Sequence, residues 1–438
     1  MFASANPDRA LAHAVLLRSI PSSNQTLARA PQEVRLLFSE PIDIVFSGIR
    51  VLNAAGELVD NRDTHVDQSD DHQLVVSLPP GLPNGVYSVD WRSLSTIDVH
   101  PDTGRFPLFV GVAVSADATR NASPVQLSAT PETTLGRWWF YLAASLFGGV
   151  LAAWRLVVGP VVAGERVEVR AALHLRVLRL VVLGGVLLVV GTLFTALAQA
   201  AAAAGVTPLA GFGQPLADLL LRGRFAAIWW PRIGLEVVSL LLVAFGGLEG
   251  LAAECALATL PGVLLTSSLT SHGAALGPLA GIGIGVDWLH IVGATTWVGG
   301  LIALLACLQP VSTADTSGHH AMWRRLLARF SRFALLASAM VVLSGVVQAV
   351  FEIGSWSALV GTGYGQLVLA KLGLFAGMLS LAGFNTWHGR SRFRDAGELT
   401  ASGPRVLRQS VWAELALGAV VLAVAAVLTG TPPTRGAP

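Results

Sequence analysis

The sequence predicts an all-β sandwich or Greek-key barrel followed by an α-helical transmembrane bundle of about eight spans. Three observations support this fold class. The chain of 438 residues is 53% hydrophobic and only 13% charged, with a mean hydropathy of +0.62, which is too apolar for a soluble globular protein. Short alternating apolar runs occupy residues 13–114, and long apolar runs occupy residues 135–438. A stretch rich in Ala, Ser, Thr and Pro separates them at residues 115–134 and predicts a linker.

Residues 1–12 are expected to be a processed remnant of an export signal. Ala10 to Ala12 have the small side chains of a signal-peptidase site, although the residues before them lack the charged and apolar segments of a complete signal peptide. Cleavage after Ala12 would make His13 the N-terminus of the mature protein.

Residues 13–114 are predicted to form the β-domain, because apolar and polar residues alternate over strand-length runs. The segment from Leu78 to Gly85, rich in Pro, Gly and Asn, predicts a turn between two of these runs. The predicted strands are Val34–Phe38, Gln73–Leu78, Val86–Trp91 and Phe106–Val110. No apolar run in this part is long enough to span a bilayer, so we expect it to lie in water.

The rest of the chain contains apolar runs of bilayer-spanning length. The predicted spans are 136–158, 172–200, 226–248, 252–270, 287–308, 331–353, 365–388 and 410–430. The connections after the first, fifth and seventh spans are rich in arginine, whereas residues 273–286 and 354–365 contain no Lys or Arg. The positive-inside rule therefore predicts that both termini and the β-domain lie on the outer face of the membrane.

Other chemistries find little support in the composition. A net charge of +2 gives no reason to expect nucleic acid as a partner. The two cysteines, Cys255 and Cys307, lie in separate apolar runs, which excludes a disulfide framework or a Cys-x-x-Cys site.

The β-domain carries a candidate copper site at His13, Asp98 and His100. If His13 is the N-terminus, its α-amine and imidazole can chelate one ion, and a second imidazole completes the nitrogen set that Cu(II) prefers. Asp98 can ligate the ion or orient a ligand. The alternative is that the Asp-x-His pair only caps a turn.

Ionisable side chains in the spans predict a copper path, because a charge inside a membrane is costly and normally functional. Its residues are His272, Asp287, His290, Met340, Glu352, Lys371 and Met378. Helical spacing places the nitrogen ligands in the outer third and the two thioethers deeper, where they suit Cu(I). We expect Lys371 to pair with Glu352 or Asp287. Alternatively, the histidines lie in the hydrated headgroup zone and the methionines only fill gaps in the core.

Residues 13–114 resemble the periplasmic copper-binding CopC family. The resemblance rests on His13 after Ala12, Ser19-x-Pro21, Ala30-Pro31, Phe38-Ser39-Glu40, Tyr87-x-Val89-x-Trp91-Arg92 and Asp98-x-His100. The spans resemble the CopD membrane family, with Ser271-His272-Gly273, His290, Lys371 and Asn385 as landmarks. The resemblance implies a Cu(II) site at His13, Asp98 and His100, although Val99 stands where the family usually has glycine.

The favoured function is copper transport and homeostasis at a bacterial plasma (inner) membrane. The β-domain would capture Cu(II) and pass it to the membrane domain for import, with Cu(I) in the deeper path. The expected partners are copper ions, the lipid bilayer and a cytoplasmic copper acceptor, and no enzymatic activity is expected. The alternatives are a membrane redox protein, whose helix histidines bind haem or copper, and an anchored copper buffer.

Overall fold

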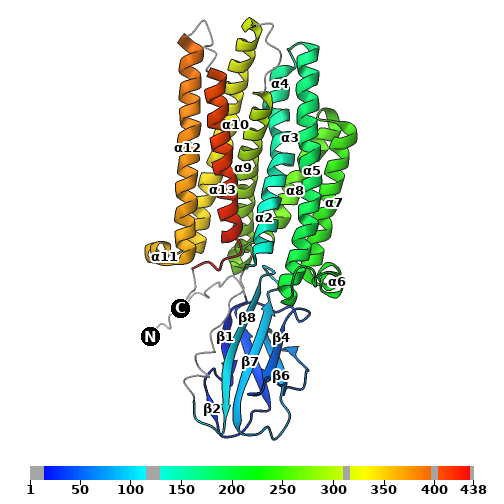
Figure 1. Cartoon of the computed structure of the whole chain (residues 1–438), viewed down its shortest axis with the longest axis vertical. Helices are drawn as coiled ribbons and strands as arrows, with labels where there is room; N and C mark the ends of the chain where they lie inside the picture. Colours follow the sequence, from blue (N-terminus) through cyan, green and yellow to red (C-terminus); the bar gives the residue numbers. More distant parts are fainter. Residues whose placement is uncertain (1–13, 115–128, 309–315, 396–402, 435–438) are drawn as a thin grey trace.

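The structure is a computed structural model that describes residues 14–114, 129–308, 316–395 and 403–434. A β-sandwich lies at one end of a long helical bundle (Figure 1). The expected export remnant 1–12, His13 and most of the expected linker fall outside the described residues.

The β-domain consists of two four-stranded sheets packed face to face, which confirms the predicted sandwich. The strand orders are β1-β3-β6-β5 and β2-β8-β7-β4. The strands are β1 (Leu16–Ile20), β2 (Thr26–Leu27), β3 (Glu33–Phe38), β4 (Gly48–Leu52), β5 (His65–Asp67), β6 (Asp70–Ser77), β7 (Gly85–Leu94) and β8 (Pro101–Val110). Along β3 every second residue is buried, as its alternating sequence predicts. Phe38 and Trp91 meet edge to face between the sheets, with ring centroids 5.3 Å apart.

The strands β7 and β8 form a long antiparallel hairpin that runs from the pair Gly85 and Val110 to the pair Leu94 and Pro101. Strand β7 therefore continues beyond its predicted end at Trp91. The connection between the two strands contains Asp98 and His100. The hairpin thus carries both candidate ligands to the end of the sandwich that faces the helices (Figure 1).

The described residues include eight helices that are long and apolar enough to cross a membrane, which confirms the predicted bundle. The first consists of α2 (Pro131–Ala144), α3 (Val150–Ala153) and α4 (Gly159–Val162), joined by the π-helical turns η1 (Ser145–Gly149) and η2 (Trp154–Val158). The others are α5 (Val167–Ala204), α7 (Gly223–Gly246), α8 (Gly250–Ser268), α9 (Ala280–Cys307), α10 (Thr316–Glu352), α12 (Gly363–Asp395) and α13 (Gly403–Leu428). The short helices are α6 (Gln214–Leu221), η3 (His272–Ala275), η4 (Gly277–Leu279) and α11 (Trp356–Gly361).

The helix boundaries differ from the predicted spans chiefly at the N-terminal ends. Helix α2 begins at Pro131, because Thr130 and Thr133 form a reciprocal capping box there. Helix α9 begins at Ala280 rather than at residue 287, so Asp287 lies one to two turns inside the helix. The start of α2 depends on its capping box, and the start of α9 lies in a glycine-rich segment. Hydropathy detects neither feature.

Gly149 of the first span and Gly299 of α9 allow these two helices to pack backbone against backbone. A Cβ atom at Gly299 would overlap the carbonyl oxygen of Ser145 and the Cα of Gly149. We expect Gly299→Ala to lower the free energy of unfolding by about 1–3 kcal/mol, the usual cost of overpacking. Thermal unfolding in detergent measures this loss. Gly234→Ala is the matched control, since nothing lies within 4 Å of the added methyl group. Equal melting temperatures for the two variants would contradict the prediction.

Candidate metal centre at the domain junction

The β-domain is docked on the helical bundle by a small apolar cluster. It joins Phe46, Leu94 and Val99 to Ala200 and Ala203 of α5 and Leu219 of α6. Beside the cluster, the guanidinium of Arg92 donates hydrogen bonds to the carbonyls of Phe46 and Ala204. The end of the β7–β8 hairpin is therefore held against α5.

Val99, between the two candidate ligands, has a left-handed backbone with φ of 60°. For a β-branched residue this conformation costs about 1–3 kcal/mol, whereas glycine adopts it freely. Val99 is almost fully buried in the docking cluster, and its carbonyl accepts a hydrogen bond of 2.5 Å from Gln199 Nε2. The side-chain contacts and this bond offset the strain, and they tie the ligand loop directly to the membrane domain.

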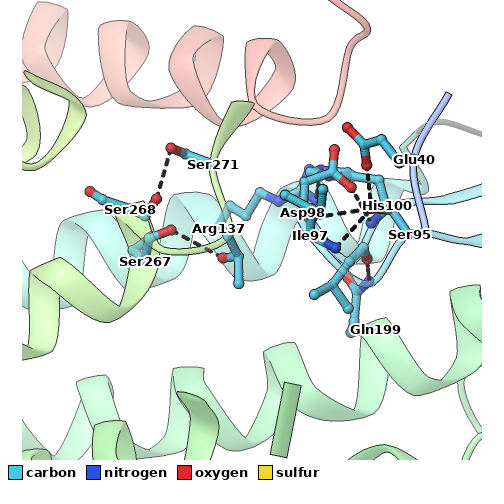
Figure 2. A network of polar contacts seen from close by, with 12 residues as sticks. Glu40, Ser95, Ile97, Asp98, His100, Arg137, Gln199, Ser267, Ser268 and Ser271 are labelled. Carbon is cyan, nitrogen blue, oxygen red and sulfur yellow. Dashed lines mark hydrogen bonds and ion pairs between the residues drawn. The ribbon is translucent and has the colours of Figure 1, made fainter. Parts of the chain in front are cut away.

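The ligand loop is also fixed from within (Figure 2). Ser95 Oγ accepts the backbone N–H of Ile97 at 2.9 Å and donates to the buried carboxylate of Glu40. The backbone N–H of His100 donates to Asp98 Oδ1 at 3.1 Å. These local bonds give the Asp-x-His segment one conformation, so its side chains are positioned before any ion arrives.

Asp98, His100 and His272 form one cluster across the domain junction. Each offers a possible metal-ligand atom, and these atoms lie within 4.8 Å of one another. Asp98 Oδ2 lies 3.0 Å from His100 Nδ1, and the rings of His100 and His272 stack with centroids 5.5 Å apart. All three residues are buried. Imidazole and carboxylate ligands in one compact group suit a divalent copper ion.

His272 begins η3, the first of two short 3₁₀ helices between α8 and α9. Burial and, to a smaller extent, the neighbouring His100 lower the pKa of His272 to about 4. The imidazole is therefore neutral at pH 7 and has a lone pair that a metal ion can use. The sequence placed this residue at the mouth of a membrane path, separate from the β-domain site, whereas the structure brings it against that site.

Arg137 of α2 also reaches the cluster, and sequence reasoning missed it. Its Nη2 lies 3.0 Å from Nε2 of His100 (Figure 2). The signal that could have found it is an arginine in the second turn of a spanning helix, at the end of the helix where the positive-inside rule expects few basic residues.

A small pocket extends from His272 toward the helices of the membrane domain. Its lining includes His272, Leu276, Asp287, Gln348, Phe351 and Glu352. Gln348 Nε2 donates to Asp287 Oδ1 at 3.0 Å, and the hydroxyl of Tyr364 donates to Glu352 Oε2 at 2.5 Å. The predicted path residues His272, Asp287 and Glu352 therefore share one pocket.

His290 and Lys371 form the next polar group. Lys371 Nζ lies 3.3 Å from His290 Nε2, and His290 Nδ1 lies 3.1 Å from Ser344 Oγ. In the described part of the chain no ion pair within 4.0 Å joins Lys371 to Glu352 or Asp287, so the expected direct pairing is not formed, although the charge of Lys371 still attracts both carboxylates. Tyr364 and Gln348 each donate one hydrogen bond to these carboxylates, and the ammonium reaches the imidazole instead.

The two methionines of the predicted path pack against apolar helix faces. Met378 belongs to the main hydrophobic core beside Val298 and Gly418, and Met340 packs on Gly293 of α9. These positions match the gap-filling alternative at least as well as a role in ligation.

Glu414 of α13 is a further buried polar residue that the predicted path did not include. Its carboxylate accepts hydrogen bonds from Trp297 Nε1 at 3.1 Å and from Asn385 Nδ2 at 3.3 Å, and only 2% of the residue is exposed. The sequence signal that could have identified Glu414 is that it is the only ionisable residue within the last predicted span.

Comparison with known proteins gives two family matches. Residues 16–111 match the CopC domain, and residues 324–428 match CopD, copper resistance protein D. The copper transport protein CutJ of Bacillus subtilis is 30% identical over 99% of this chain and 76% of its own length. Copper resistance protein D of Pseudomonas syringae pv. tomato is 31% identical over 49% of this chain and 71% of its own length. The crystal structure of PcoC from Escherichia coli is 30% identical over 23% of this chain and 99% of that chain, with a TM-score of 0.20.

Proposed function

Since the chain belongs to the copper transport and resistance proteins that join an N-terminal CopC domain to a CopD domain, we propose that it imports copper. The β-domain captures Cu(II) with His13, Asp98 and His100. His272 then accepts the ion at the junction and passes it into the membrane domain.

The observation that carries this proposal is the shared cluster of Asp98, His100 and His272. Two of its members belong to the β-domain, and the third belongs to the membrane domain. An ion held by the first two can exchange onto the third without crossing bulk water, because the possible ligand atoms lie within 4.8 Å of one another. Ligand exchange over so short a distance avoids the cost of rehydrating and again desolvating the ion.

The onward route follows the polar groups of the membrane domain. The pocket below His272 presents the carboxylates of Asp287 and Glu352, which attract a cation. The pair of His290 and Lys371 comes next along α9 and α12. We propose these side chains as the path, with Met340 and Met378 as thioether contacts for copper deeper in the bundle.

The orientation of the β-domain in this proposal rests on the arginine distribution. Helix α11, in an arginine-free connection, lies at the β-domain end of the bundle (Figure 1). Under the positive-inside rule this end faces outward, and the β-domain lies on the periplasmic or extracellular side of a bacterial plasma membrane. A cytoplasmic copper acceptor would keep the inner concentration of free copper low.

The redox alternative has helix histidines binding haem or copper, and His272 and His290 are the two candidates for such a shared group. In the structure His272 stacks on His100, and His290 contacts Ser344 and Lys371. The two imidazoles therefore have different partners, and no geometric observation favours haem.

Replacing a capture ligand should mainly affect the copper concentration that uptake requires. We expect His100→Ala to raise the half-saturating external copper concentration about tenfold, because it removes one ligand while the remaining path is intact. Radioactive copper uptake into proteoliposomes, measured over a range of external copper concentrations, gives this half-saturating concentration. The control is His65→Ala, an exposed histidine of the same domain. An unchanged half-saturating concentration would show that the β-domain site does not load the transporter.

A further inference from the structure

Arg137 engages the same imidazole that the proposed function assigns to copper. A guanidinium carries only N–H donors, so the contact of 3.0 Å with His100 Nε2 makes that nitrogen the acceptor. Nδ1 of the same ring then carries the proton, and it lies 3.0 Å from Asp98 Oδ2. In this tautomer Nε2 carries the only lone pair of the ring, and the guanidinium occupies it, so a metal ion can use this lone pair only after the guanidinium has left.

The guanidinium also has the charge of a substitute cation. Arginine stays protonated at every physiological pH, and the charges of Arg137 and Asp98 attract each other. Asp98 and His100 are each only 2% exposed, so solvent screens this attraction and any repulsion of copper only weakly. A copper ion and Arg137 thus compete for one carboxylate–imidazole pair.

The other contacts of Arg137 hold its guanidinium only weakly in its position beside His100. Its Nη1 is buried, and no hydrogen-bond acceptor for it lies among the described residues. The same nitrogen approaches Gly430 so closely that a Cβ atom there would overlap it. A buried donor without an acceptor is unfavourable. The position of Arg137 against His100 therefore carries a free-energy penalty, which makes it easier for an incoming ion to displace the guanidinium.

From these contacts we infer that Arg137 is a tethered cation that occupies the copper position at His100 between captures and, on returning, displaces the ion toward His272. The inference rests on the proposed function, and it adds the step that releases copper from the β-domain. A site without such a competitor would bind copper more tightly and deliver it more slowly.

The test uses the full chain in lipid nanodiscs and proteoliposomes, with Cu(II) alone as the probe. We expect Arg137→Gln to bind Cu(II) about tenfold more tightly in competition with a chromophoric chelator. The same variant should take up copper about tenfold more slowly at saturating copper, because release becomes limiting. The matched control is Arg92→Gln, which removes the other arginine that crosses the junction but does not touch a ligand. Its copper affinity should stay at the wild-type value.

Unchanged or weaker copper affinity in a folded Arg137→Gln variant would overturn the inference. If that variant does not fold, Arg137→Lys replaces it: the lysine keeps the charge, so wild-type affinity supports the inference and a marked loss of affinity overturns it. Electron paramagnetic resonance of bound Cu(II) separates failure of the inference from failure of the proposed function. Identical spectra for the wild type and His272→Ala would show that His272 is not a ligand, which sinks the proposed function itself.

Discussion

Replacing His272 by alanine is expected to lower the maximal rate of copper uptake about 100-fold, because among the described residues it is the candidate ligand that the membrane domain contributes to the junction cluster. Asp98 and His100 remain, so the β-domain should still bind Cu(II), with an affinity about tenfold weaker. The relevant measurement is the maximal uptake rate in proteoliposomes together with the copper affinity of the same preparation.

The combination of the two readouts distinguishes transfer from simple binding. His65→Ala, an exposed histidine of the β-domain, should change neither. If His272→Ala weakened binding but left the maximal rate at the wild-type value, copper would have to enter the membrane domain by another route, and the transfer step at the junction would be wrong.

Replacing His290 by alanine should abolish uptake to below about one hundredth of the wild-type rate while leaving Cu(II) binding by the β-domain unchanged. His290 lies between Ser344 and the only lysine of the chain. Alanine removes an imidazole from the proposed path and leaves the half-buried ammonium of Lys371 without its hydrogen bond to the ring. Uptake assays combined with copper titration of the full chain test both halves of this expectation.

Ser344→Ala provides the matched control for this prediction. It removes the hydrogen bond to His290 Nδ1 but keeps the ring, so the rate should fall only severalfold, about 3-fold for one lost neutral hydrogen bond. Rates near the wild-type value in His290→Ala would exclude this histidine from the path, and the anchored copper buffer would become the better description of the protein.

The two-domain architecture was predictable because it depends on local patterns. Alternation with period two marks β3, and apolar length marks all eight spans, so both follow from short stretches of sequence. The Asp98-x-His100 segment could also be located in advance, since it follows a clear strand and precedes another. Helix ends were predicted less well, because capping at Thr130 and the glycine-rich start of α9 act through the backbone.

Side-chain pairing inside the bundle was predicted less successfully than the spans. Lys371 was expected to meet a carboxylate, but the ammonium contacts His290, while Tyr364 donates to Glu352 and Gln348 donates to Asp287. Helical periodicity states which residues share a face of one helix. It does not state the height or rotation at which two helices pack, and these decide the hydrogen-bond partners.

The sequence by itself thus determined the β-sandwich, the eight spans and the candidate ligands within each domain. Only the tertiary structure decided that His272 stacks on His100 and that Arg137 contacts the same ring. Both contacts depend on how the β-domain docks on α5, through a strained Val99 and its bond to Gln199. Docking joins residues that are distant along the chain, and its free energy comes from surface complementarity, which no local pattern of residues encodes.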